Sequence, residues 1–159
     1  MKGKILSLEE LAEESRQLRS MGKRVVATNG CFDILHVGHV RYLAAARKLG
    51  EVLVVGLNGD DSVRQLKGEG RPVNPEHDRA EVLAALESVD YVTIFPELRA
   101  TNFLRAAQPA IYAKGGDYTA DTLDLEERTV LEKFGTKIEI IPFEQGYSTS
   151  QLLTRIGKA

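Results

Sequence analysis

The most constraining feature of the sequence is an uninterrupted apolar run at residues 52–57, VLVVGL. A strand that is apolar at every position has to be covered on both faces, as the central strands of parallel sheets are. Other strand-like apolar runs recur at residues 24–28, 90–95, 110–113 and 137–142. Segments with helical spacing separate them. This alternation predicts an α/β fold, a Rossmann-like, doubly wound, five-stranded parallel sheet in a single domain.

The helices are predicted from apolar spacing together with start and stop residues. The first one begins with Ser7 and Glu10, which form a capping box, and ends at Gly22. The later helices are expected at residues 40–49, in a short segment ending at 66, and at 75–86, 99–107, 122–134 and 150–156. We therefore expect residues 1–21 to form an N-terminal helix and residues 22–159 to form the functional domain.

Composition and charge exclude several classes of protein. The chain has 159 residues and a net charge of -2, which argues against broad nucleic-acid binding, because that usually requires a basic surface. Its single cysteine cannot form an internal disulfide, and no apolar run approaches the roughly 18 residues of a membrane span. The N-terminal segment lacks the apolar core of a signal peptide. We expect a cytoplasmic protein that binds neither nucleic acid nor membrane.

In a doubly wound sheet, ligands bind beyond the carboxyl ends of the strands. The loop after the first strand contains Gly30 and the run His36-Val37-Gly38-His39. Gly30 allows a sharp turn whose amides can face an anion, and Gly38 opens a helix whose N-terminus is partly positive. The histidines are three positions apart, so both rings can donate N–H groups to phosphate oxygens on one side. This loop is therefore the first candidate for a phosphate site.

The same residues allow other interpretations. Two histidines at this spacing can ligate zinc, but no third-ligand pattern lies nearby, and they can also be surface residues at a helix start. Cys31 is interpreted as a small packing residue in this loop, because no activating base for a nucleophile is evident. We expect no metal site made of protein side chains.

The loop after the second strand is basic. Lys67 and Arg71 lie on either side of two glycines, which would allow this segment to close over a triphosphate as a lid. Lys67 is the first choice for neutralising the α-phosphate, and a solvated basic loop is the alternative. Arg79, on the next helix, is a weaker candidate, because it can pair locally with Glu76 or Asp78.

Polar residues also follow the fourth and fifth strands. Lys114-Gly115-Gly116-Asp117 combines a cation for phosphate, glycines for close backbone approach and a carboxylate for ribose hydroxyls. Ser148-Thr149-Ser150 opens the last helix, where hydroxyls can either cap the helix or bind phosphate. Both loops are expected at the same edge of the sheet as the histidines.

The run GCFDILHVGH at residues 30–39 resembles the G-x-F-D-x-x-H-x-G-H signature of the nucleotidyltransferase superfamily, which includes the cytidylyltransferases. The resemblance implies that Phe32, His36 and His39 hold a triphosphate. The expected catalytic residues are His36, His39 and Lys67. The expected nucleotide-binding residues are Gly30, Cys31, Phe32, His36, Gly38, His39, Lys114, Gly116, Asp117, Ser148, Thr149 and Ser150. The expected acceptor-binding residues are Asp33, Asn58, Asp60, Lys67 and Arg71.

Taken together, the segments TNGCFDILHVGHVRYL, GLNGDDSVRQLKGEGRPVNPEHDRAEVLAAL, KGGDYT and GYSTS resemble the heptose 1-phosphate adenylyltransferases of ADP-heptose synthesis, over residues 22–157. This resemblance implies transfer of AMP from ATP, with Mg²⁺, to D-glycero-β-D-manno-heptose 1-phosphate. The products would be pyrophosphate and ADP-heptose for the lipopolysaccharide core. In many bacteria this adenylyltransferase is the C-terminal half of a two-domain protein that also contains a sugar kinase. We expect a stand-alone homodimer whose sugar kinase is a separate chain.

Two alternatives stay open at this point. One is a cytidylyltransferase acting on glycerol 3-phosphate or a similar alcohol phosphate. Cytidylyltransferases usually carry an arginine at the start of the Ser/Thr motif, and this chain has none near Tyr147. The other is a non-catalytic nucleotide sensor. The presence of His36, His39 and Lys67 together argues against a sensor, which needs no groups for stabilising a transition state.

Overall fold

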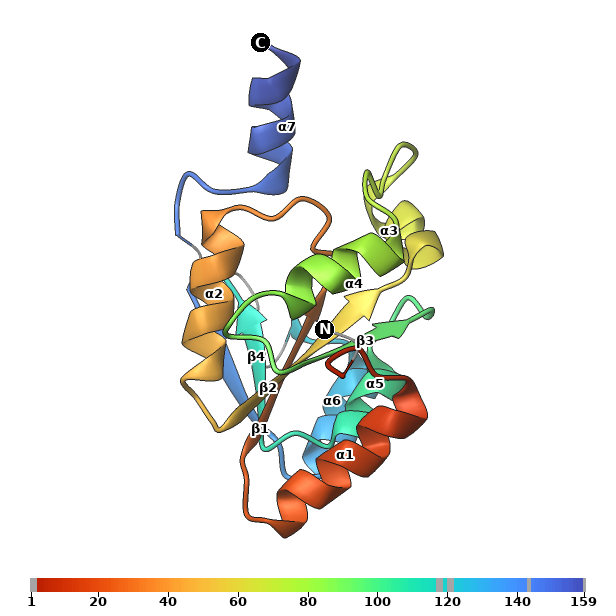
Figure 1. The fold of residues 1–159 in the computed structure, drawn as a ribbon, viewed down its shortest axis with the longest axis vertical. Coiled ribbons are helices and arrows are strands. Elements are labelled where there is room, and N and C mark those ends of the chain that lie inside the picture. Colours follow the sequence, from red (N-terminus) through yellow and green to blue (C-terminus); the bar gives the residue numbers. More distant parts are fainter. Residues whose placement is uncertain (1–2, 117–118, 120–121, 143, 159) are drawn as a thin grey trace.

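The computed structural model describes residues 3–116, 119, 122–142 and 144–158. Its centre is a parallel sheet with strand order β3-β2-β1-β4-β5, which confirms the predicted five-stranded, doubly wound fold (Figure 1). The strands are β1 (Val25–Gly30), β2 (Val52–Asn58), β3 (Tyr91–Phe95), β4 (Ile111–Gly115) and β5 (Lys137–Ile141). This order places the point where the winding reverses between β1 and β4, where such sheets bind ligands.

The apolar run in β2 is buried at every residue, as its composition predicted. The strand pairs with β1 on one side and β3 on the other, and helices cover both of its faces. Its side chains therefore alternate between two separate apolar clusters: Val54 belongs to one, and Leu53 and Val55 belong to the other.

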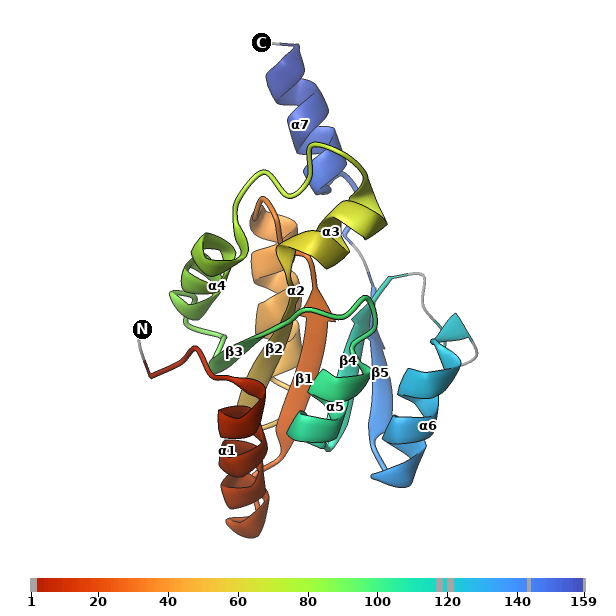
Figure 2. The ribbon, with the colours of Figure 1, turned by 90° about the vertical axis from the view of Figure 1, so that its right-hand side faces the viewer.

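Helices form a layer on each face of the sheet (Figure 2). One layer contains α1 (Leu8–Ser20), α5 (Thr101–Ala107) and α6 (Leu125–Lys133), whose buried side chains share one core cluster. The other contains α2 (Val37–Arg47) and α4 (Glu76–Ala84). The remaining two helices, α3 (Asp60–Lys67) and α7 (Thr149–Gly157), lie at the carboxyl edge of the sheet.

The N-terminal helix is part of this core. Leu11 and Leu18 of α1 are buried in the same cluster as Phe103 and Leu104 of α5. Just before α1, residues 4–6 run parallel to β3. The Leu6 amide donates a hydrogen bond to the Val92 carbonyl, and the Val92 amide donates one to the Lys4 carbonyl. The N-terminal segment is thus joined to the domain through both the helix layer and the sheet edge.

Two boundaries differ from the predicted ones in ways that affect the site. Helix α2 begins at Val37 and not at 40, because the His36 ring serves as the helix cap: its Nδ1 accepts a hydrogen bond from the Gly38 amide. Strand β4 continues to Gly115, so Lys114 lies in the sheet, paired with Ile140, and not in the loop that follows. In both cases the regular element extends into the expected loop.

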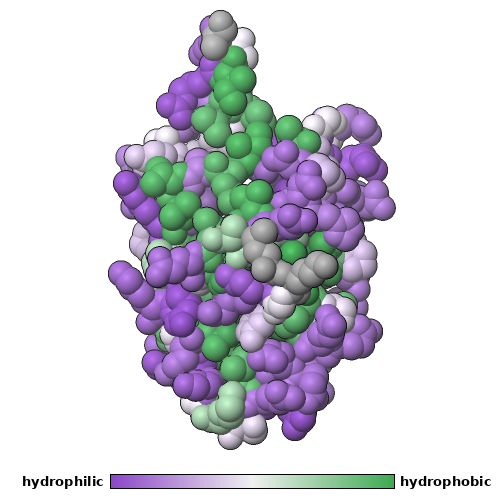
Figure 3. Space-filling model, in the orientation of Figure 1, coloured by the Kyte–Doolittle hydropathy of each residue, from purple (hydrophilic) through white to green (hydrophobic). Residues whose placement is uncertain are grey.

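Helix α7 projects from the carboxyl edge, away from the layers (Figure 1). None of its residues is buried within the described structure, and Ile156 is 60% exposed. On the face shown in Figure 3, the hydrophobic surface of α7 continues down onto the body of the molecule. No helix in the described parts of the chain is long and apolar enough to cross a membrane.

Gly56, at the centre of β2, is required by close packing. A Cβ atom built there would lie 2.8 Å from the ring of the buried Phe103, which stacks on Phe95. We expect Gly56→Ala to lower the free energy of unfolding by about 1–3 kcal/mol, because overpacking moves the ring off its site. Urea denaturation measures this. The control is Gly3→Ala, where a Cβ meets no atom within 4 Å, and equal stability of the two variants would contradict the packing argument.

Candidate active site

A cleft of about 1050 Å³ opens at the carboxyl edge of the sheet. It is lined by the loops and helix starts that follow β1, β2, β4 and β5, as expected for a doubly wound fold. The predicted site residues that line it are Gly30, Cys31, Phe32, Asp33, His36, Gly38, His39, Asn58, Lys67, Arg71, Lys114, Ser148, Thr149 and Ser150. Segments distant in sequence thus meet around one space.

Backbone amides at the start of α2 fix the orientation of the two histidine rings of the motif. The His36 Nδ1 accepts from the Gly38 amide at 3.1 Å, and the His39 Nδ1 accepts from the His36 amide at 3.3 Å. An amide N–H donates only to an unprotonated nitrogen, so each neutral ring carries its proton on Nε2. The ring centroids are 4.0 Å apart. The pair therefore presents two Nε2–H donors at the start of α2.

Gly38 is what allows this geometry. A Cβ at this position would lie 2.9 Å from ring atoms of His36 and 2.9 Å from the Cβ of Tyr147. Tyr147 stacks on His36 with ring centroids 6.4 Å apart, and the Arg41 guanidinium lies 5.6 Å from the tyrosine ring centroid. The glycine of the motif thus serves the packing of the histidine against the segment before α7.

Both histidines are kept neutral. Burial, together with a smaller effect of the neighbouring His36, lowers the pKa of His39 to about 4. Burial also lowers the pKa of His36. Neutral imidazoles donate hydrogen bonds without a permanent charge.

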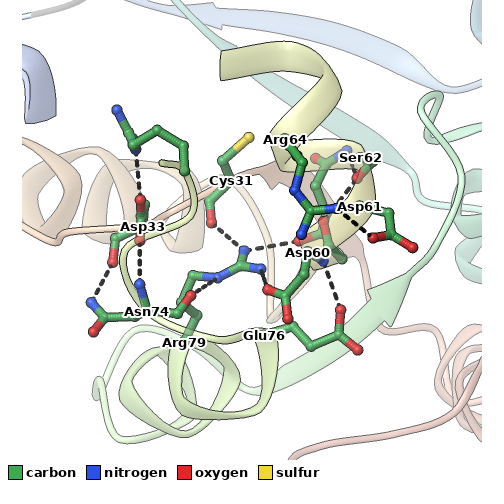
Figure 4. Close-up of polar contacts among 12 residues, drawn as sticks. Cys31, Asp33, Asp60, Asp61, Ser62, Arg64, Asn74, Glu76 and Arg79 are labelled. Atoms are coloured by element: carbon green, nitrogen blue, oxygen red, sulfur yellow. Dashed lines mark hydrogen bonds and ion pairs between the residues drawn. The ribbon is translucent and has the colours of Figure 1, made fainter. Parts of the chain in front are cut away.

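Asp33 anchors the far end of the basic loop (Figure 4). Its buried carboxylate accepts from the Arg71 Nε at 2.7 Å, from the Val73 amide at 2.8 Å and from the Asn74 amide at 2.9 Å. Burial alone would raise the pKa of Asp33, but the two amides and Arg71 outweigh it and leave the pKa below its ordinary value. The expected contact between Asp33 and the acceptor stays a prediction, and the structure adds this anchoring role.

Lys67 is the last residue of α3 and lines the cleft. The backbone then turns at Gly68, where φ is 95°, and Gly70, where φ is 84°. Arg71 and the residues after it are hydrogen-bonded to Asp33, and Lys67 belongs to α3. The conformational freedom of the loop is therefore confined to residues 68–70. Whether the loop closes on a ligand stays a prediction.

Arg79, a weaker candidate for the site, does not form the local pair with Glu76 or Asp78 that was its alternative interpretation. The residue is 2% exposed, and its guanidinium reaches inward to Asp60 at 2.8 Å. Asp60 and Gly116, both expected at the site, are not among the residues that line the cleft. Asp117, also expected there, lies outside the described residues.

The loops after β4 and β5 contribute two kinds of group. Lys114 is largely buried, and its pKa is lowered by burial, with the Glu127 carboxylate acting in the opposite direction. The Ser148 hydroxyl caps α7 by accepting from the Gln151 amide, as the capping interpretation expects. The Thr149 hydroxyl donates to the Ile34 carbonyl, which joins the start of α7 to the loop after β1.

Sequence reasoning missed a group that lines the cleft after β3. Leu98 and Arg99 follow this strand, and Arg99 pairs with Asp124 at 3.5 Å near the start of α6. Glu127 of α6 is buried beside them and accepts from the Ala100 amide at 2.8 Å. The rule that ligands bind beyond strand ends applied to this loop as well, and it would have found Arg99.

The donor set of the cleft suits an anion. In the described part of the chain, no group of three or more His, Cys, Asp or Glu side chains is placed to hold a metal ion. The side chains reaching the cleft include imidazole, ammonium and guanidinium groups, which bind phosphate oxygens.

Comparison with known proteins agrees with this fold. The sequence model of the cytidylyltransferase-like family matches residues 27–155, so the chain belongs to that family. The fold, the cleft and this membership define a nucleotidyltransferase. More particularly, the chain is 47% identical to the bifunctional protein HldE of Geobacter sulfurreducens over 98% of its own length. It is 49% identical to HldE of Citrifermentans bemidjiense over 96% of its length.

The chain spans 31% of the length of these two relatives. Among solved structures, it is similar to a lipopolysaccharide core biosynthesis protein from Thermoplasma volcanium, with a TM-score of 0.64 and 29% identity. That match covers 80% of this chain and all of the solved one.

The neutral state of His39 predicts how stability depends on pH. Between its folded pKa of about 4 and the ordinary value of 6.5, the unfolded chain binds a proton that the folded chain does not. This contribution to stability is present above pH 6.5 and is lost as the pH falls through that window. We expect His39→Gln to flatten the fall of the urea midpoint between pH 7 and pH 4.5. Parallel curves for the variant and the wild type would contradict a neutral His39.

Proposed function

We propose that the chain transfers the AMP group of ATP to heptose 1-phosphate, giving ADP-heptose and pyrophosphate. The observation that carries the proposal is the pair of Nε2–H donors of His36 and His39 in a cleft that also receives Lys67. The volume of the cleft lies at the upper end of the usual range for ligand sites, which leaves room for a nucleotide and a second phosphorylated substrate. The HldE relatives support the choice of sugar.

In the proposed reaction, a phosphate oxygen of the sugar attacks the α-phosphorus of ATP in line. The bond from the α-phosphorus to the bridging oxygen breaks, and pyrophosphate leaves with that electron pair. The attacking oxygen is already an anion, so no general base is required. Catalysis is then positioning and charge stabilisation, in which His36, His39 and Lys67 donate hydrogen bonds to phosphate oxygens as negative charge shifts toward the leaving group.

Mg²⁺ is proposed to enter with ATP, held by triphosphate oxygens and water, and to neutralise part of the triphosphate charge. The protein groups assigned above act on oxygens of the nucleotide and need no protein ligand for the cation. Ser148, Thr149 and Lys114 are proposed to bind the nucleotide on the β4–β5 side of the cleft.

We also propose a homodimer and a separate kinase. A sugar 1-phosphate can be made by phosphoryl transfer to the anomeric hydroxyl, and we propose that a separate sugar kinase supplies the acceptor in this way. The exposed apolar surface of α7 supports association of two copies. Light scattering on the purified chain measures the oligomeric state.

The substrate assignment is tested by pyrophosphate release with ATP or CTP and a panel of acceptors that includes heptose 1-phosphate, other sugar 1-phosphates and glycerol 3-phosphate. We expect turnover with ATP and heptose 1-phosphate. Preference for CTP with glycerol 3-phosphate would replace the proposed substrates. ATP binding without pyrophosphate release from any acceptor would contradict the enzyme assignment.

His39→Ala is expected to lower kcat by roughly 100-fold or more, with a much smaller change in the Kd for ATP. The reason is that its hydrogen bond strengthens as charge develops in the transition state. Steady-state kinetics and calorimetry measure the two quantities, and His77→Ala is the matched control because His77 does not line the cleft. Equal losses in kcat and affinity would mean that His39 serves ground-state binding alone.

A further inference from the structure

Arg79 is a deeply buried charged residue, and its contacts connect four segments at the carboxyl edge (Figure 4). Its guanidinium donates to the carbonyl oxygens of Cys31, Asn58 and Asn74 at 2.8, 2.8 and 2.9 Å. It also donates to the Asp60 carboxylate at 2.8 Å. These acceptors belong to the loop after β1, the end of β2, the end of the basic loop and the first turn of α3.

The bond to Cys31 determines where the next amide points. The C=O of Cys31 and the N–H of Phe32 belong to one trans peptide unit, so they point in opposite directions. With the carbonyl held toward Arg79, the Phe32 amide faces away from that buried side chain, in a loop that lines the cleft. Among the described residues, this amide donates to no protein atom. It is therefore free to bind an anion.

The backbone at Phe32 is strained: its φ is 43°, in a region that residues other than glycine rarely adopt. Such a conformation persists only where the neighbouring structure imposes it. On one side the Cys31 carbonyl is held by Arg79, and on the other the Asp33 side chain is held by Arg71, Val73 and Asn74. The amide direction is thus fixed from both sides.

Arg79 also fixes the helix that carries Lys67. Asp60 is the first residue of α3 and is held by the Arg79 guanidinium, while its amide donates to Glu76 at 2.7 Å. A short helix held at its first turn transmits that position to its last residue. Lys67 therefore depends on Arg79 through the length of α3.

We propose that Arg79 is a positioning residue for nucleotidyl transfer, which aims the Phe32 amide at the triphosphate and sets the place of Lys67. The inference rests on the proposed function, since it assigns both groups to the nucleotide. An arginine is needed because its planar fork of five N–H donors can serve carbonyl and carboxylate acceptors lying in different directions. A lysine at the same depth has three donors on one nitrogen and cannot reach all four.

The test compares Arg79→Lys with Arg16→Lys, which alters an exposed ion pair on α1 far from the cleft. Pyrophosphate release gives kcat and the KM for ATP, at a temperature where circular dichroism shows each variant folded. We expect Arg79→Lys to lose roughly 10- to 100-fold in kcat and Arg16→Lys to match the wild type. A folded Arg79→Lys variant with the kcat of the wild type would overturn the inference. A wild-type protein that releases no pyrophosphate would overturn the proposed function instead.

A second readout separates positioning from general stability. In ¹⁵N-labelled protein, adding a non-hydrolysable ATP analogue is expected to shift the Phe32 amide resonance strongly in the wild type. In Arg79→Lys that shift is expected to shrink, while the resonances of Ser148 and Thr149 still respond to the analogue. An unchanged Phe32 response in the variant would show that Arg79 serves only the fold.

Discussion

The structure of the site depends on how a buried arginine ties together backbone segments that the sheet alone would leave free. The parallel strands bring the loops after β1 and β2 to one edge, but a strand end does not set the direction of the peptide units that follow it. Arg79 sets these directions by donating to three carbonyl oxygens, and Asp60 balances its charge. Asp33, which carries the opposite charge, also orients peptide units, because its carboxylate accepts hydrogen bonds from backbone amides. Two buried charges thus shape a loop that carries no regular structure.

This arrangement suits a reaction whose nucleophile is already ionised. The protein then has to hold phosphate groups in line and respond to shifting negative charge, which fixed N–H donors do without reorganisation. The His36 and His39 rings are locked as Nε2–H donors by backbone amides at their Nδ1 atoms. Their burial keeps them neutral. The motif works through its spacing and through the glycine that lets His36 pack against Tyr147.

The sequence was sufficient for the features that depend on local pattern. The apolar run in β2 predicted a central parallel strand, and the loops after strands predicted where the histidines, Lys67 and the Ser/Thr segment would gather. The anchoring contacts were not predictable in this way, because Asp33 and its partners are about forty positions apart. Arg79 had plausible partners within its own helix, and only packing made Asp60 its partner. Burial of a charged side chain is a property of the assembled core, which periodicity does not reveal.

The amide of Phe32 and the Nε2–H groups of His36 and His39 are proposed to form one phosphate-binding surface. A crystal structure with a non-hydrolysable ATP analogue and Mg²⁺ would show whether they do. We expect phosphate oxygens within hydrogen-bonding distance of all three donors, with the α-phosphate near the Lys67 side chain. A triphosphate bound elsewhere in the cleft, with these donors facing solvent, would contradict it.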